Sequence, residues 1–478
     1  MIGAWRKITN ARTTNGTSAT VLICALMVAE ITCSLESNMI FAALSGLYAT
    51  YGDPVKVNWL ITGFTLAAAS SAAIGGRLGD IYGRRRVLLV MLALSVSGSL
   101  LSATTDVFEV VVVGRVLQGM TMAVLPLCFG LLRENLALED VGVGVGLLGS
   151  VYALTVGIGT VLGGIIVDNF NWQAIFLASA FTGLLAFLAT LRFVPPSKSP
   201  PSTAPLDLIG GILFAPAIAA IIYGISTGGQ QAGGIGLLLG GVMTLMVWAR
   251  YELRHSHPLL DLRLLHRREM LLVCLAMMLT AMGPMMMLIV LLPLLQQPTW
   301  TGIGFELPAA LAGMLKLPGN IVAAAAIVCG GLLAKRIGLR PVLLISMGVT
   351  IAGWIALSLW HDALWVVVVI MSLALSPGVS VVTAMAPQMV IANTPGGRVG
   401  EATGMLQVFR ALGQALSGQV LGYCLATSLV TSPDDGNHFP TEAAFVASFV
   451  VIAALAAAVF TLFAGLRSDR PIASGARL

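Results

Sequence analysis

The chain has 478 residues, of which 57% are hydrophobic and only 10% are charged. Because a soluble domain carries about 25% charged residues, this composition excludes an ordinary soluble protein and indicates a membrane protein. The net charge of +5 does not by itself identify a partner, so the placement of the basic residues has to be considered.

Apolar runs long enough to cross a bilayer as helices recur along the whole chain, separated by short polar segments. Six runs precede the first linker, at 20–47, 58–79, 87–105, 108–131, 141–167 and 172–191. That linker, at 195–205, reads PPSKSPPSTAP, and its prolines and serines predict a tether. Further runs follow at 207–226, 232–250, 270–295, 307–333, 341–359, 364–390, 401–430 and 442–466, with a basic connector at 250–269. The pattern predicts an all-α polytopic membrane protein with about 14 transmembrane helices.

Basic residues alternate between the two sides of these predicted spans. Of the 26 Lys and Arg residues, 22 fall on one side and only Lys56 falls on the other. Three more, Arg115, Lys316 and Arg410, lie inside predicted spans. By the positive-inside rule we expect a multi-pass protein of the cytoplasmic (inner) membrane with both termini in the cytoplasm. The basic charge therefore indicates topology, and we expect no nucleic-acid partner.

The chain contains an internal repeat. Residues 75–89 read GGRLGDIYGRRRVLL, and residues 330–344 read GGLLAKRIGLRPVLL, with the same leading glycines and the same VLL ending. Both copies join two predicted spans on the same side, as expected for parallel six-helix repeats. We therefore predict an N-terminal six-helix bundle at 1–193, a linker with two inserted helices at 194–269, and a C-terminal six-helix bundle at 270–478.

Three segments of the first half match short sequence motifs of a known family. The loop between the second and third spans matches a family signature at Gly76, Leu78, Asp80, Gly83, Arg84 and Arg85. The segment GRVLQG, with Arg115, matches a fourth-helix motif, and LESNMIFAAL at 35–44 resembles a first-helix motif with Glu36 as its acid. On these motifs the sequence resembles the major facilitator superfamily, and within it the fourteen-helix drug:proton antiporter branch.

This resemblance implies a fold and a function. The fold is two six-helix bundles plus two inserted helices. The function is proton-coupled export of amphipathic or drug-like small molecules across the cytoplasmic membrane. A carrier for a specific organic anion or lipid, working by symport or uniport, is the alternative. A membrane-embedded enzyme is disfavoured, because no nucleophile–base or metal constellation stands out.

The fifth predicted helix departs from the pattern of the antiporter branch. Its motif ends in Gly-Pro-x-x-Gly-Gly, whereas this chain has Gly159, Thr160, Gly163 and Gly164. Gly159 and Gly163 keep the small-xxx-small spacing that lets two helices approach closely. The proline that would kink the helix is missing, so the direction of transport stays open.

Two acids in the first span are candidates for proton coupling. The chain has no phosphate-binding loop, so we expect an ion gradient rather than a nucleotide cofactor to supply the energy. Glu30 and Glu36 are the acids well inside a span, and we favour Glu36 because it lies at the motif position. A structural ion pair is the alternative for each. Arg115 either tunes the proton site or ties its helix to the first one.

Two cations in the second half are candidates for substrate binding. Lys316 lies in a span at a position that is usually apolar in the branch, and it meets either a substrate anion or Glu30 or Glu36. Arg410 lies deep in the thirteenth span and either pairs with an acid or holds an anionic substrate.

The loop signature is a candidate conformational latch. Asp80 can pair with Arg84 or Arg85, or with a helix start, and Lys335 replaces it in the second copy, so the latch would be one-sided. Gly76 and Gly83 allow the tight turn. We expect no metal or cofactor, since His255 and His257 lack a third ligand, and we expect a monomer that works with protons and a small-molecule substrate in the bilayer.

Overall fold

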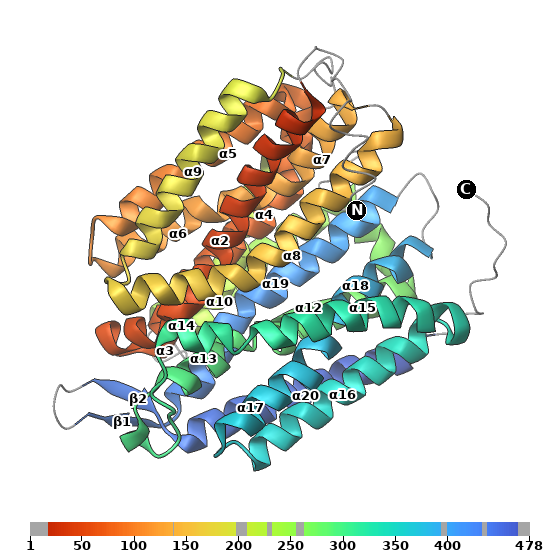
Figure 1. Cartoon of the computed structure of the whole chain (residues 1–478). Helices are drawn as coiled ribbons and strands as arrows, with labels where there is room; N and C mark the ends of the chain where they lie inside the picture. Colours follow the sequence, from red (N-terminus) through yellow and green to blue (C-terminus); the bar gives the residue numbers. More distant parts are fainter. Residues whose placement is uncertain are drawn as a thin grey trace. The chain divides into compact units, whose positions relative to one another are not determined.

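The computed structural model describes residues 18–136, 138–196, 208–226, 232–254, 262–392, 399–432 and 437–466. The chain forms two compact units, which do not follow the midpoint of the sequence. Unit 1 comprises Met1–Ala43 and Gly63–Ala219, and unit 2 comprises Leu44–Thr62 and Ala220–Leu478. The boundaries between the units fall inside three helices, α2, α4 and α10, which are labelled in Figure 1.

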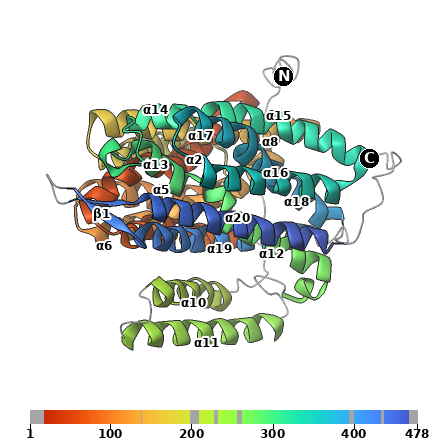
Figure 2. The same ribbon diagram turned by 90° about the horizontal axis from the view of Figure 1, so that it is seen from below.

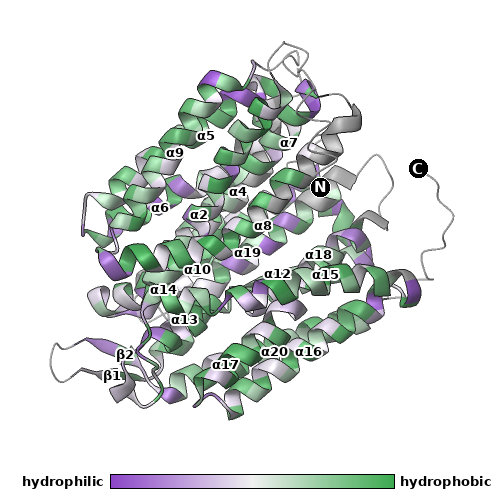
Figure 3. Cartoon of the chain, viewed as in Figure 1, coloured by the Kyte–Doolittle hydropathy of each residue, from purple (hydrophilic) through white to green (hydrophobic). Residues whose placement is uncertain are grey.

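Unit 1 is built almost entirely from helices of the first half of the chain. They are α2 (Ala19–Tyr51), α4 (Trp59–Tyr82), α5 (Arg84–Ala103), α6 (Phe108–Gly119), the 3₁₀ turn η1 (Met120–Ala123), α7 (Val124–Asn135), α8 (Leu138–Asn169), α9 (Ala174–Phe193) and α10 (Leu208–Ser226). The residues coloured in Figure 3 are mostly hydrophobic along these helices, as expected for helices that lie in a bilayer.

Unit 2 contains the helices of the second half and one hairpin. The elements are α3 (Pro54–Val57), α11 (Ala232–Arg254), η2 (Leu262–His266), α12 (Arg268–Met282), η3 (Pro284–Met286), α13 (Leu288–Gln296), η4 (Thr299–Thr301), α14 (Ala309–Met314), α15 (Leu317–Ile337), α16 (Leu339–Leu359), α17 (Leu364–Ile370), the π-helical turn η5 (Met371–Leu375), α18 (Ser376–Ala392), α19 (Val399–Ala426), β1 (Leu429–Thr431), β2 (His438–Pro440) and α20 (Glu442–Ala464).

The helices overlap the predicted apolar runs, although α2 extends to Tyr51 and α4 to Tyr82, beyond the predicted ends at 47 and 79. Among the described residues, ten helical stretches are long and apolar enough to cross a membrane. Helix also occupies the other four predicted runs, in α4, α8, α10 and α19. The chain is thus a multi-pass helical membrane protein, and the count of fourteen spans stays a prediction.

Two of the predicted spans differ from the helices in the structure. The predicted run 270–295 breaks at Gly283, since Pro284 has no N–H to continue the hydrogen-bonding pattern of α12. The predicted run 401–430 extends too far, because α19 ends at Ala426 and the chain continues into β1. Strand β1 pairs antiparallel with β2, with Val430 opposite Phe439.

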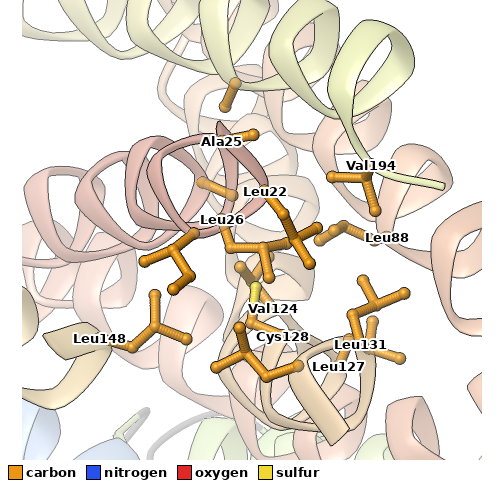
Figure 4. Close-up of a cluster of buried hydrophobic side chains, with 14 of the residues drawn as sticks. Leu22, Ala25, Leu26, Leu88, Val124, Leu127, Cys128, Leu131, Leu148 and Val194 are labelled. Carbon is orange, nitrogen blue, oxygen red and sulfur yellow. The ribbon is translucent and has the colours of Figure 1, made fainter. Parts of the chain in front are cut away.

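Unit 1 has a hydrophobic core at one end of its helices (Figure 4). Leu22 and Leu26 of α2 pack with Leu88 of α5 and with Leu127 and Leu131 of α7. These five side chains are almost completely buried. The core therefore fixes α2 against α5 and α7.

The segment Leu44–Thr62 belongs with unit 2 although its sequence lies in the first half. Thr62 Oγ1 donates to the Ala415 carbonyl of α19 at 3.0 Å, and Gln419 Nε2 donates to Thr62 Oγ1 at 3.1 Å. A Cβ at Gly422 would lie 2.5 Å from Asn58 Nδ2 and 3.2 Å from the Pro54 carbonyl oxygen, so α19 approaches this segment closely at Gly422. This segment is therefore in the same compact unit as Ala220–Leu478, and the bundle boundaries at 193 and 269 stay predictions.

Within unit 2, the last turns of α10, residues 220–226, lie beside α11; both helices are labelled in Figure 2. A Cβ at Gly224 would lie 2.7 Å from the Gly234 carbonyl oxygen and from Leu238 Cβ, so the two helices cross closely at this glycine. They occupy the predicted inserted segment, 194–269, between the six-helix repeats.

Candidate functional site

A buried carboxylate in unit 1 is surrounded by hydroxyl groups. Glu36 of α2 is 2% exposed. Ser95 Oγ of α5 donates to its Oε1, Ser99 Oγ approaches the same oxygen at 3.5 Å, and Thr121 Oγ1 of η1 donates to Oε2 at 3.1 Å. Two helical segments, α5 and η1, supply these partners, so hydroxyl groups lie within hydrogen-bond distance of both carboxylate oxygens. The Thr121 hydroxyl also lies 2.7 Å from the Gln118 carbonyl oxygen.

Arg115 of α6 contacts the residue that carries this carboxylate. Its Nη1 donates to the backbone carbonyl of Glu36 at 3.1 Å and to Gln118 Oε1 at 2.9 Å. Gln118 Nε2 in turn donates to Ser99 Oγ at 2.6 Å, and the guanidinium carbon lies 4.3 Å from the centre of the Phe64 ring. Arg115 therefore both ties α6 to α2 and adds a positive charge to the site, so the two interpretations from the sequence are compatible. We call Glu36, Ser95, Ser99, Arg115, Gln118 and Thr121 the Glu36 cluster.

Close helix packing allows the cluster to form. A Cβ at Gly98 of α5 would overlap the Gly114 carbonyl oxygen of α6, and a Cβ at Gly119 would overlap the Phe64 carbonyl oxygen of α4. Glycine at these crossings brings the backbones together. The short side chains of Ser95 and Ser99 can then reach a carboxylate on a neighbouring helix.

Glu30 occupies a different environment on α2. Its side chain is 1% exposed, and its Oε2 has no hydrogen-bond partner in the part of the chain that the structure describes. No described hydroxyl or cation satisfies this oxygen, in contrast to both oxygens of Glu36. The structure thus separates the two predicted proton-coupling acids by their surroundings.

The glycines of the fifth predicted helix lie against α2. A Cβ at Gly163 would lie 2.7 Å from the Met39 carbonyl oxygen, and one at Gly159 would lie 3.0 Å from Asn38 Cβ. Gly164 is buried as well. Thr160 is buried and donates to the Gly157 carbonyl at 3.0 Å within α8, which continues as one helix from Leu138 to Asn169.

The loop signature places its arginines against other helices of unit 1. Gly83 has φ +90°, a conformation that favours glycine, and it joins α4 to α5. Arg84 Nη1 donates to Glu134 Oε1 at 2.9 Å and to the Gly130 carbonyl at 3.0 Å. Arg85 Nη2 donates to the Leu191 carbonyl at 2.6 Å. An acid of α7 thus pairs with the signature arginine.

Some of the predicted latch residues lie outside the description of side chains. Gly76 and Asp80 are within helix α4, and their side-chain environments are outside the described residues, as is that of Lys335. The tether at 197–205 and the pair His255 and His257 are also outside the described residues. Their predicted roles stay predictions.

The two candidate cations of unit 2 are inside the helical bundle. Lys316 is 6% exposed at the junction of α14 and α15. Arg410 of α19 is half-buried, and its Nε has no hydrogen-bond partner within the described residues. Pairing of Lys316 with Glu30 or Glu36 stays a prediction.

Several polar partners of Glu36 and Arg84 could not be predicted from the sequence. Ser95, Ser99 and Thr121 lie among many serines and threonines in apolar helices, and only folding shows which of them face Glu36. Glu134 lies in RENLALED near a helix end, where an acid is ordinary. Among the described residues, no group of three or more His, Cys, Asp or Glu could hold a metal ion.

The chain is similar in sequence to a family of known proteins. A family model described as Major Facilitator Superfamily matches residues 26–418 and 319–477. An uncharacterized transporter of this type, YvkA of Bacillus subtilis, is 26% identical over 84% of this chain and 89% of its own length. The tetracenomycin C resistance and export protein of Streptomyces glaucescens is 25% identical over 87% of this chain and 77% of its own. The uridine/deoxyuridine transporter of Lactococcus lactis is 26% identical over 87% and 88%.

Solved structures of similar fold include a nucleoside transporter, NupG (D323A mutant). It is 13% identical, covers 93% of this chain and 99% of its own, and superposes with a TM-score of 0.65. At this identity the similarity concerns the fold alone.

Proposed function

Because the chain belongs to the major facilitator superfamily of membrane transporters, we propose that it exports amphipathic or drug-like organic molecules across the cytoplasmic membrane in exchange for protons. Its relatives include an antibiotic export protein, which supports export of such molecules. They also include a nucleoside transporter, so family membership alone leaves the substrate open. The positions of the basic residues support cytoplasmic termini.

The environment of Glu36 is the observation that carries the proposal of proton coupling. A proton carrier has to be stable both with and without its proton. When ionised, the carboxylate accepts hydrogen bonds from the hydroxyls of Ser95, Ser99 and Thr121. When protonated, it donates one hydrogen bond, and hydroxyl oxygens can accept it because Ser and Thr both donate and accept. Rotation of the hydroxyls thus accommodates either state.

Arg115 connects the protonation state of Glu36 to helix packing. Its guanidinium group attracts the carboxylate only while the carboxylate is charged, since the Coulomb term vanishes on protonation. The same side chain is bonded to the Glu36 backbone and to Gln118. Protonation would therefore weaken the attraction between α2 and α6, and it would favour a rearrangement of these helices during the transport cycle. The Arg84–Glu134 pair would serve as part of the predicted latch in the same unit.

Substitution of Glu36 by glutamine tests this proposal. The full chain is reconstituted in vesicles, and uptake of a lipophilic cation such as tetraphenylphosphonium is driven either by an imposed pH gradient or by substrate exchange. We expect E36Q to abolish the gradient-driven uptake and to retain exchange, because the amide preserves the shape of the side chain but cannot carry the proton.

Glu109 provides the matched control. It is an exposed acid at the start of α6, so E109Q removes a carboxylate without touching the Glu36 cluster, and we expect it to behave as the unmodified chain. Gradient-driven accumulation by E36Q at the level of E109Q would refute Glu36 as the proton carrier.

A carrier for a specific organic anion is the second candidate function. Two observations favour it: the buried cation Lys316, and Thr160 in place of the proline of the antiporter motif. Uptake of organic anions that is independent of the pH gradient, with no transport of lipophilic cations, would favour this alternative.

A further inference from the structure

Polar side-chain atoms without partners gather where α15 packs against η5 and the start of α18, within unit 2. Ser372 and Ser376 are 5% and 4% exposed. Their hydroxyl oxygens, and Asn320 Nδ2, have no hydrogen-bond partner within the described residues. Buried polar groups are nearly always hydrogen-bonded, so three such atoms on neighbouring turns indicate a missing partner.

A glycine brings these elements together. A Cβ at Gly319 of α15 would lie 2.7 Å from Ser376 Oγ and 3.3 Å from Ser372 Cα. Asn320 is the next residue, and Lys316 is three residues before Gly319, so both lie within one turn of this contact. Segment η5 is π-helical, a wider helical turn that often occurs at functional sites. We call Lys316, Asn320, Ser372 and Ser376 the Lys316 cluster.

Lys316 has no acidic partner among the residues of unit 2 that the structure describes. The side chain is 6% exposed, and no carboxylate oxygen lies within 4.0 Å of its amine in the described part of the chain. A cation in the membrane interior is costly unless an opposite charge accompanies it. Neutral hydroxyl and amide groups supply hydrogen bonds but no charge.

The donors of the cluster match an anion. The lysine ammonium and the Asn320 amide nitrogen can only donate, and the two serine hydroxyls donate as well as accept. One cation among neutral donors balances a single negative charge, which favours a monoanion over a dianion.

We infer that the Lys316 cluster binds the monoanionic oxygen group of an organic ligand, either the carboxylate of an amphipathic substrate or the phosphodiester of an anionic lipid. This inference rests on the proposed function only in taking the chain to be a transporter. It assigns a chemical class to one end of the substrate and a residue set to its recognition. It requires neither Glu36 nor a proton gradient.

The test uses two probes that differ only in charge, 2-naphthoate and its neutral amide 2-naphthamide, with binding to the purified full chain in detergent measured by equilibrium dialysis. We expect naphthoate to bind more tightly than naphthamide. The substitution K316M should weaken naphthoate binding about tenfold or more and leave naphthamide binding within about twofold, since it removes a charged hydrogen-bond donor. The double substitution S372A/S376A should weaken naphthoate binding by a smaller factor.

The matched control is Lys56, an exposed lysine of α3 in the same unit. K56M removes the same charge, so an equal loss of naphthoate binding in K56M and K316M would overturn the inference. The same applies if K316M is monodisperse and binds naphthoate as the unmodified chain does. If K316M fails to fold, unchanged naphthoate binding in S372A/S376A would overturn it instead.

A lipid arm separates the two sources of the anion. Phosphatidylglycerol is added to the detergent at increasing mole fraction, and competition with naphthoate in the unmodified chain but not in K316M would support the site with a lipid as ligand. Absence of binding by both probes overturns the inference while leaving gradient-driven export of tetraphenylphosphonium to be tested separately. Conversely, naphthoate binding that depends on Lys316 supports it even if E36Q transports normally.

Discussion

Replacing Gly163 with alanine should force helices α2 and α8 of unit 1 apart. The added Cβ would lie 2.7 Å from the Met39 carbonyl oxygen and 2.9 Å from Met39 Cα. Ordinary contacts of this type are about 3.4–4 Å, and both neighbouring atoms are backbone, so no side-chain rotation relieves the overlap. The helices would have to shift by several tenths of an ångström. Overpacking of this kind costs about 1–3 kcal/mol.

The assay is the thermal midpoint of the purified chain in detergent. For a unit of this size each kcal/mol corresponds to roughly 2–4 °C in Tm. Gly348→Ala is the matched control, because nothing lies within 4 Å of a Cβ at Gly348 in α16, and alanine there should be neutral or slightly stabilising. Gly159→Ala should have a smaller effect, since its contact is a side-chain atom at 3.0 Å. If G163A and G348A have the same Tm, the result would contradict the close approach of α8 to Met39.

Two further experiments test the packing, one in each unit. In a double-mutant cycle of Arg84→Gln and Glu134→Gln, we expect a coupling of about 1 kcal/mol, because the pair is 2.9 Å apart with side-chain exposures of 23% and 8%; additive effects on Tm would contradict the ion pair. Thr62→Val should lower the stability of unit 2 by about 1–3 kcal/mol, because the Ala415 carbonyl loses its donor and Gln419 loses its acceptor. Thr50→Val is its control, since Thr50 is exposed and bonds only within its own helix; equal melting of the two variants would argue against the Thr62 contacts.

Helix positions were predictable from the sequence because a long apolar run leaves few alternatives. The predicted range 58–79 contains most of α4, and 341–359 contains most of α16. The break at Gly283 had a signal in its Gly-Pro pair, whereas η1 at Met120–Ala123 had none. The hairpin was missed because its strands have three residues each, too few for a periodic pattern.

The candidate sites were predictable only in part. Glu36, Arg115 and Lys316 stand out because charge is rare inside apolar spans, and their burial agrees with that reasoning. Their partners could not be identified, since Ser95 and Ser372 look like many other serines in the chain. Which polar residue faces a charge depends on helix rotation and on glycine contacts such as Gly319 with Ser376, which are set by tertiary packing.

The assignment of Leu44–Thr62 to unit 2 also depends on tertiary packing. The internal repeat places this segment in the first half, and no local pattern distinguishes it from its neighbours. Its contacts with α19 depend on Gly418 and Gly422, which lie against Thr62 and Asn58. Long-range contacts of small residues of this kind leave no periodic signal in the sequence.

Proton movement coupled to substrate movement tests the central claim most directly. The unmodified chain is reconstituted in vesicles with a pH dye in the lumen and the membrane potential clamped, and tetraphenylphosphonium is added outside. Exchange for protons predicts that the lumen becomes more alkaline as substrate enters, in vesicles with the unmodified chain and not in protein-free vesicles or with E36Q. Substrate uptake with an unchanged or more acidic lumen would contradict it.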